Sequence, residues 1–353
     1  DNISRDLILS GAITNLVNLG VTGLTSNPSI FDKAISESSE YDESLKILLQ
    51  NSTDDKAIYE SLAIEDIRSA ADLLYGVYLS SKYKDGYACL EVSPLLAYDT
   101  EGTIFEAQRL FKELARPNVM IKVPATPEGI PAIKSLISKG INVNVTLIFS
   151  LAAHRDVMEA YISGLEDLDR SGGDVSTVAS VASFFVSRLD TSVDAVLEGL
   201  SKECKMSTDI MLGKSAIANA KIAYESFCLK FGTKRFEQLR TKGALVQRPL
   251  WASTSTKNPL YRDVLYVEQL MGADTVNTVP PSTLDAFIDH GIAEDTILSD
   301  LDDAKDIMEL LRESGVNVDD ITTKLLKDGV DAFSKSFVQI LSNVQAKRSI
   351  LVP

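Results

Sequence analysis

Short apolar runs recur along the chain, and segments with helical spacing lie between them. The runs cover residues 21–24, 87–92, 119–123, 141–149, 175–185, 244–252 and 275–279. Between residues 103 and 115, apolar side chains recur every three or four positions, which is the spacing of one helix face. Strands that alternate with helices favour a parallel sheet with helical crossovers.

The number of runs indicates how such a sheet closes. Seven runs are visible, and an eighth would lie at the extreme N-terminus, around Asp1. Eight parallel strands close into a (β/α)8 TIM barrel. The alternative is an open doubly wound sheet, but neither G-x-G-x-x-G nor G-x-x-x-x-G-K-[ST] follows any run. We therefore expect an α/β protein with the TIM-barrel fold and additional helices.

The additional helices are expected in three segments. Residues 32–84 and 188–242 exceed simple crossovers, and residues 299–347 are helical in period. No low-complexity linker divides the chain. The sequence predicts one barrel domain over residues 1–353, with helical insertions at 32–84 and 188–242 and C-terminal helices at 299–347.

Charge and cysteine content narrow the classes of partner. The chain has 35 Lys and Arg against 50 Asp and Glu, so its net charge is −15. An acidic surface disfavours nucleic acid and anionic membranes, but a local cationic pocket can still bind a small phosphorylated substrate. No apolar run is long enough to span a bilayer.

The three cysteines, Cys89, Cys204 and Cys228, form neither a metal-like pair nor a disulfide framework. We expect reduced thiols and a cytoplasmic location, or the plastid stroma if a transit peptide precedes Asp1.

Polar residues interrupt the apolar run 141–149 in strict alternation. Successive side chains in a strand point to opposite faces. We expect the apolar set to face the outer helices and the polar set to point into the barrel. The apolar set is Ile141, Val143, Val145 and Leu147, and the polar set is Asn142, Asn144 and Thr146. Two interpretations stay open: a satisfied polar layer in the core, or a site at the carboxyl ends of the strands, where barrel active sites lie.

Lys122 stands inside the apolar run Met120-Ile121-Lys122-Val123. A lysine is rarely buried without a reason, and burial disfavours the ammonium relative to the neutral amine. A neutral amine can attack a carbonyl and form a Schiff base. The alternative is a buried stem whose ammonium pairs with Glu91.

Other polar residues also follow apolar runs, and each has two interpretations. A carboxylate at Glu91 relays protons through a water or only forms an ion pair. Asn27 binds a substrate hydroxyl or begins a turn before Pro28. Ser183 ends an apolar run, and Arg188 follows it by five residues. Arg188 either binds a phosphate or forms a surface salt bridge. We interpret His154 and His290 as structural, because His154 has no second His or Cys at ligand spacing and His290 lies at a helix end before Gly291. Phe184 and Phe185 are interpreted as core residues.

Taken in order, these segments resemble the transaldolase family, in particular its longer branch found in many bacteria. The stretches that carry the resemblance are GVTGLTSNPSIF (20–31), LEVSP (90–94), MIKVPAT (120–126), NVNVTLIFS (142–150), VASFFVSR (181–188), LWAST (250–254) and VNTVP (276–280). No single motif is unique, but the ordered set spans nearly the whole chain.

The resemblance implies a class I mechanism with neither metal nor organic cofactor. It implies reversible transfer of a dihydroxyacetone unit from sedoheptulose 7-phosphate or fructose 6-phosphate to an aldose phosphate, in the pentose phosphate pathway. Lys122 matches the Schiff-base lysine, Glu91 and Thr146 the pair that holds a catalytic water, and Asp1 the acid/base for C–C cleavage. Asn27, Asn144 and Ser183 match residues around the ketose carbonyl and hydroxyls, and Arg188 matches a phosphate-binding arginine.

One departure concerns the phosphate. Many members of the family follow the Ala-Ser of the seventh strand with Phe-Arg, and that arginine binds phosphate. Here Ser253 is followed by Thr254-Ser255-Thr256-Lys257. Ser253, Ser255 and Lys257 are therefore candidates beside Arg188. The competing functions are a simple aldolase of the same mechanism, a non-catalytic barrel that binds sugar phosphates, and a dinucleotide-dependent oxidoreductase.

Overall fold

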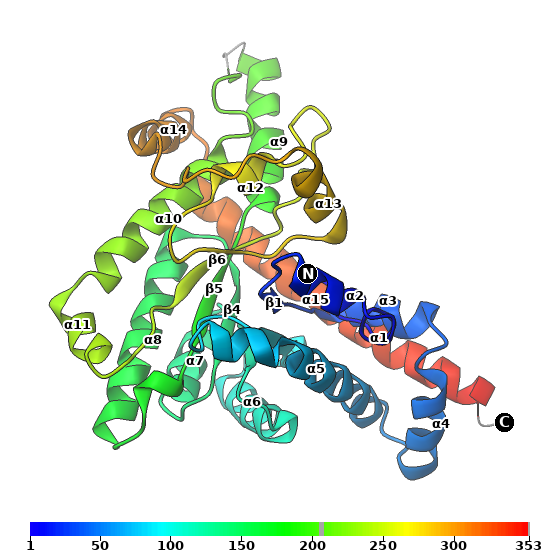
Figure 1. Cartoon of the computed structure of the whole chain (residues 1–353). Coiled ribbons are helices and arrows are strands. Elements are labelled where there is room, and N and C mark those ends of the chain that lie inside the picture. Colours follow the sequence, from blue (N-terminus) through cyan, green and yellow to red (C-terminus); the bar gives the residue numbers. More distant parts are fainter. Residues whose placement is uncertain (205–207, 352–353) are drawn as a thin grey trace.

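Seven parallel strands form one curled sheet in sequence order. The computed structural model describes residues 1–204 and 208–351. The strands are β1 (Gly23–Leu24), β2 (Tyr87–Glu91), β3 (Val119–Pro124), β4 (Val143–Ile148), β5 (Ser180–Phe185), β6 (Arg248–Ala252) and β7 (Val276–Asn277). Each strand pairs in parallel with the next one along the chain, from β1 to β7. This arrangement is the curled wall of a TIM-type barrel with helices outside it (Figure 1).

Helices fill every connection and both ends of the chain. The N-terminal helices are α1 (Arg5–Leu9) and α2 (Ala12–Asn18). Between β1 and β2 lie α3 (Pro28–Glu37), α4 (Asp42–Asn51) and α5 (Asp55–Ser80). The next crossovers contain the 3-10 turn η1 (Pro94–Leu96), α6 (Thr100–Leu114), α7 (Gly129–Ile137), α8 (Leu151–Arg170) and the 3-10 turn η2 (Val175–Thr177). Between β5 and β6 lie α9 (Ser187–Cys204), α10 (Ser215–Phe231) and α11 (Lys234–Arg240), and α12 (Leu265–Gln269) precedes β7. The chain ends with α13 (Pro281–His290), α14 (Leu301–Glu313) and α15 (Val318–Leu351).

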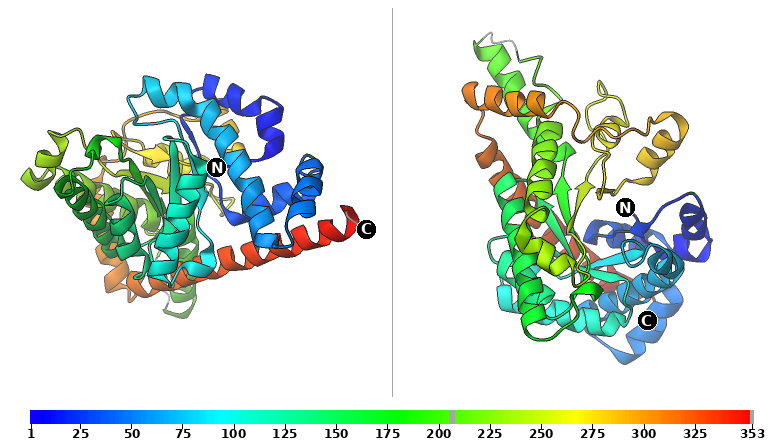
Figure 2. Two further views of the ribbon diagram at one scale, coloured as in Figure 1. Left: turned by 90° about the horizontal axis from the view of Figure 1, so that it is seen from below. Right: turned by 60° about the vertical axis from the view of Figure 1, so that its left-hand side comes forward.

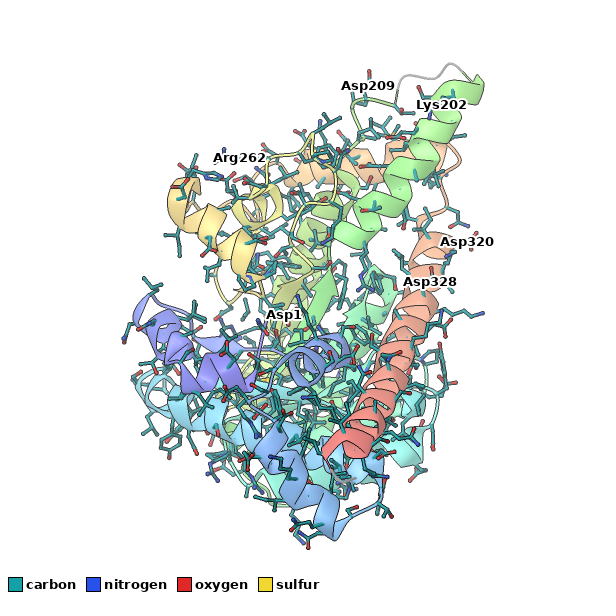
Figure 3. The ribbon with its side chains drawn as sticks, turned by 90° about the vertical axis from the view of Figure 1, so that its right-hand side faces the viewer. Asp1, Lys202, Asp209, Arg262, Asp320 and Asp328 are labelled. Atoms are coloured by element: carbon teal, nitrogen blue, oxygen red, sulfur yellow. The ribbon has the colours of Figure 1, made fainter. Side chains whose placement is uncertain are left out.

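The first residues of the chain lie between the two outermost strands. The nitrogen of Asp1 donates to the Val279 carbonyl, 2.7 Å away, just after β7. The Thr25 hydroxyl, just after β1, donates to Asp1 Oδ1 at 2.8 Å. Residues 1–4 belong to no strand, so the eighth strand expected there does not form, and α1 already begins after its cap residue Ser4. Figure 3 shows Asp1 near the centre of the molecule.

Several predicted strands begin too early. β5 starts at Ser180, and residues 175–177 form η2, which Asp174 caps through the Ser176 amide. β6 starts at Arg248 rather than at residue 244. Val175 and Ala244 are buried like strand residues. Burial alone therefore does not distinguish a strand from the turn that leads into it.

The alternation predicted for β4 breaks at Leu147. Its φ is +59°, and the pairing of β4 with β5 shifts register between Val145 and Ile148. Leu147 packs with the inner cluster that contains Phe149 and Phe333, so its predicted orientation toward the outer helices was wrong. A bulge of this kind turns a side chain to the other face and is common beside active sites.

The C-terminal helix α15 crosses the sheet at the carboxyl ends of the strands. It packs on α3, α5, α9, η1 and β4, and Figure 2 shows it running along one side of the whole molecule. Gly329 allows the close approach to β4, because a Cβ there would lie 2.9 Å from Leu147 Cδ2. The same helix brings Phe333 over the strand ends.

Both histidines lie at helix ends, as expected. His154 is in the first turn of α8, fully buried, with its ring edge-to-face against Phe184. Burial lowers the pKa of His154 to about 4, so the ring is neutral at physiological pH. His290 ends α13 and lies 2.9 Å from Asp263. No helix in the described part of the chain has the length and apolar character needed to cross a membrane.

Candidate active site

A cavity of about 210 Å³ at the carboxyl ends of the strands brings together ten of the eleven predicted site residues. The ten are Asp1, Asn27, Lys122, Asn144, Thr146, Ser183, Arg188, Ser253, Ser255 and Lys257. The eleventh, Glu91, lies against Lys122. The cavity is therefore the place where residues from most of the chain meet, at the end of the barrel where catalytic sites form.

Lys122 occupies the centre of this constellation. Its side chain is 8% exposed, and its Nζ lies 3.4 Å from Glu91 Oε2 and donates to the Ser26 carbonyl at 2.8 Å. Glu91, Lys122 and Asn144 are register partners across β2, β3 and β4. Three neighbouring parallel strands therefore present a carboxylate, an amine and an amide in one row.

Two buried oxygens at this site make no hydrogen bond to protein, although one of them belongs to the ion pair with Lys122. Glu91 Oε2 and Thr146 Oγ1 make no hydrogen bond to any described residue. Burial raises the pKa of Glu91, and the Lys122 ammonium opposes that rise. Buried polar atoms are nearly always satisfied by protein or by ordered water. Both oxygens can therefore bind a water molecule.

The amide of Asn144 is held in one orientation. Ser183 donates its hydroxyl to Asn144 Oδ1 at 2.6 Å, and Asn144 Nδ2 lies 3.5 Å from Cys89 Sγ. Cys89 was interpreted only as a reduced thiol, and nothing in the sequence marked it as a neighbour of the site. It projects from β2 next to Asn144, which became apparent only once the strands were in register.

Asn27 has a structural role and also lines the cavity. Its Oδ1 accepts the Ile30 amide at 3.1 Å and caps α3, and Pro28 follows as the first residue of that helix. This cap matches the turn interpretation of the sequence. The same residue faces the cavity, so the two interpretations do not exclude each other.

One wall of the cavity carries positive charge. Arg188 lies at the start of α9 above the Phe185 ring, 5.5 Å from its centroid, and makes no ion pair with the described residues. Burial lowers the pKa of this guanidinium. Lys257 donates to the Ser255 hydroxyl at 2.6 Å in the loop after β6. A cationic group that no carboxylate neutralises is suited to bind an anion.

Ser253 has a strained backbone beside this charged wall. Its φ is +57°, which is uncommon for a residue with a Cβ. The Ser187 amide donates to the Ser253 carbonyl at 3.0 Å, and the two hydroxyls are 2.9 Å apart. Strain of this kind persists where the surroundings fix it, often at functional sites.

Sequence reasoning missed six residues that line the cavity, namely Thr25, Phe185, Ala252, Thr278, Pro280 and Phe333. Thr25 and Thr278 have their hydroxyls 2.7 Å apart, and Thr25 holds Asp1. Phe185 was predicted as core; it is 7% exposed but also lines the cavity. Phe333 arrives from α15, far along the chain, and no local pattern could connect it with the site. Within the described ranges, no group of three His, Cys, Asp or Glu side chains is arranged to hold a metal ion.

The fold and the cavity define an enzyme of the parallel α/β barrel class, with a buried lysine among polar side chains at the carboxyl ends of the strands. The chain belongs to the transaldolase/fructose-6-phosphate aldolase family, whose model matches residues 1–344. It is 43% identical to a Trichodesmium erythraeum protein named Transaldolase, over 100% of this chain and 95% of the relative. It is also 43% identical to Transaldolase 2 of Nostoc punctiforme, with the same coverage. A Mycolicibacterium smegmatis Transaldolase is 44% identical over 98% of this chain and 93% of that protein. These findings confirm the predicted family, fold class and enzyme class.

Proposed function

We propose that the chain transfers a dihydroxyacetone unit from a ketose phosphate to an aldose phosphate through a Schiff base on Lys122. The observation that carries the proposal is the position of one buried lysine in a row with a carboxylate and an amide, opposite an unneutralised arginine. Relatives that align with nearly the whole chain are named Transaldolase, which supports this activity over the aldolase activity that the family name also includes.

The cycle begins when Lys122 Nζ attacks the C2 carbonyl of the donor. The ammonium must first lose its proton, and the Glu91 carboxylate, 3.4 Å from Nζ, is the base that can take it. A carbinolamine forms and loses water to give an iminium. Glu91 Oε2 and Thr146 Oγ1 hold the water through which protons move in these steps, because both atoms are buried and make no hydrogen bond to a described residue. Asn144, fixed by Ser183, binds the hydroxyl region of the ketose.

Cleavage of the C3–C4 bond follows from the iminium. Asp1 removes the proton of the C4 hydroxyl, the bond electrons move into the iminium, and an aldose phosphate leaves. The Thr25 hydroxyl orients the Asp1 carboxylate for this step. The retained enamine then adds to the acceptor aldehyde, and hydrolysis of the new iminium releases the product ketose. Asn27, facing the same cavity, supplies a further polar contact for the donor.

Dependence on an acceptor separates this function from a simple aldolase. With fructose 6-phosphate alone, we expect one equivalent of aldose phosphate per site, followed by near-complete arrest, because the enamine stays on Lys122. Added erythrose 4-phosphate should restore continuous turnover. The measurement is a coupled assay for released aldose phosphate at enzyme concentrations high enough to resolve the burst. Steady release of dihydroxyacetone without an acceptor would instead favour the simple aldolase.

Arg188 is proposed to hold the substrate phosphate, together with Ser253, Ser255 and Lys257. We expect Arg188→Ala to raise the KM for fructose 6-phosphate by about a hundredfold, since a charge-assisted contact to phosphate contributes about 3 kcal/mol. The efficiency with an unphosphorylated donor should change less than threefold. Steady-state kinetics with both donors make the comparison. Arg170→Ala, an exposed change on α8 outside the cavity, is the matched control. An equal loss for both donors would contradict a phosphate role.

We further propose that the chain is one domain, because one cluster of buried apolar residues extends from Ile3 to Val344. The absence of nucleic acid and membrane as partners stays a prediction from the net charge. The cytoplasmic location also stays a prediction.

A further inference from the structure

Two buried aspartates on α9 have no part in the mechanism. Asp190 and Asp194 are 1% and 7% exposed, and they lie one helical turn apart, just after Arg188. Neither makes an ion pair with the residues that the structure describes. A buried carboxylate without a cation loses hydration that only strong hydrogen bonds replace.

The two carboxylates make the same pattern of bonds. Asp190 accepts the Ala216 amide at 2.6 Å and the Tyr266 hydroxyl at 2.8 Å. Asp194 accepts the Gly213 amide at 3.1 Å and the Tyr261 hydroxyl at 2.6 Å. Each aspartate therefore joins α9 to the segment that begins α10 and to a tyrosine from the segment after β6. Burial raises the pKa of Asp190 to about 7, which the two bonds only partly offset.

The loop after β6 is consequently attached to α9 at both ends. At its start, the Ser187 amide and hydroxyl contact Ser253. At its end, the Tyr261 hydroxyl reaches Asp194. Between these points the loop carries Ser255 and Lys257, which line the cavity opposite Arg188. These two contacts fix the position of the loop that carries Lys257 relative to helix α9, which carries Arg188.

Packing around Tyr261 leaves little freedom. A Cβ on Gly213 would lie 2.7 Å from Tyr261 Cζ, and Gly213 has a φ of +68°. The ring therefore rests directly on the backbone whose amide bonds to Asp194. Figure 1 shows α9 and α12 next to each other, and Figure 3 shows Arg262, the residue after Tyr261, on the outer side of this region.

We infer that Asp194 and Tyr261, assisted by Asp190 and Tyr266, are positioning residues that hold the loop with Ser255 and Lys257 against Arg188 to complete a phosphate subsite. The inference rests on the proposed function and deepens it. None of the four touches the reacting carbons. They act on substrate through the loop, so their loss should weaken binding of the phosphate and leave chemistry at Lys122 intact.

Tyr261→Phe tests the inference, because it removes one hydroxyl and keeps the ring on Gly213. We expect the KM for fructose 6-phosphate and the inhibition constant for inorganic phosphate to rise together, by about tenfold, as for loss of one hydrogen bond to a charged group. The kcat and the KM for an unphosphorylated donor should change less than twofold. Tyr224→Phe is the matched control, because Tyr224 on α10 also loses one hydroxyl, which donates to the Ala273 carbonyl. This variant should leave all four constants unchanged.

A double-variant cycle with Arg188→Ala separates this inference from the proposed function. If the two act on one phosphate, Tyr261→Phe should raise the KM much less in the Arg188→Ala background than in the parent. A selective effect of Arg188→Ala with none of Tyr261→Phe would overturn the positioning role and leave the proposed function intact. If Tyr261→Phe lowered the melting temperature and left all kinetic constants unchanged, the hydrogen bond between Tyr261 and Asp194 would have only a structural role, and the positioning role would be overturned. A selective effect of Tyr261→Phe without one of Arg188→Ala would retain the loop as the phosphate ligand and remove the arginine from the proposed function.

Discussion

Replacement of Lys122 by arginine is expected to reduce transfer by about 10,000-fold or more, as for loss of a nucleophile that acts as part of a unit. The guanidinium stays protonated and cannot form the imine. The positive charge beside Glu91 is retained, so the buried carboxylate keeps its partner and the protein should still fold. The assay is transfer from fructose 6-phosphate to erythrose 4-phosphate, with circular dichroism to verify the fold.

The matched control for this variant is Lys305→Arg. Lys305 is half-exposed on α14, pairs with Glu225 and lies outside the cavity. Its replacement should leave the transfer rate within twofold of the parent. Undiminished transfer by Lys122→Arg would remove Lys122 from the mechanism.

Asp1→Asn is expected to form the Schiff base and yet cleave the donor about 1,000-fold more slowly, the range for loss of a general base. The amide can still accept from the Thr25 hydroxyl, but it cannot take the proton of the C4 hydroxyl. A single-turnover measurement of aldose phosphate release isolates the cleavage step, and trapping with borohydride shows that the imine still forms. Asp6→Asn, an exposed change in the first turn of α1, serves as the control. Near-normal turnover by Asp1→Asn would transfer the role to Glu91.

The parts of the site that could be predicted from the sequence are those that a pattern within one strand indicates. A lysine within an apolar run, or polar residues at every second position of 141–147, already indicate a strand whose inner face is polar. Because parallel strands end at the same side of a barrel, such residues were expected to meet, and ten of the eleven candidates line one cavity. The sequence also indicated Arg188 through its distance from Ser183.

The parts that could not be predicted depend on contacts between distant segments. The bulge at Leu147 interrupts a pattern that is strictly alternating in sequence, and the Leu147 side chain lies against Gly329 of α15, which is far along the chain. Phe333 reaches the cavity only because α15 crosses the strand ends. The bonds of Asp194 and Tyr261 join residues 67 positions apart. Pairings of this kind leave no local period in the sequence.

The amino group that binds the donor can be identified directly by chemical trapping. The parent protein is incubated with fructose 6-phosphate, reduced with borohydride and digested, and the peptides are mapped by mass spectrometry. We expect one dihydroxyacetone-derived adduct per chain, on Lys122 and on no other lysine. An adduct on another residue, or none at a concentration of donor that supports full transfer, would contradict it.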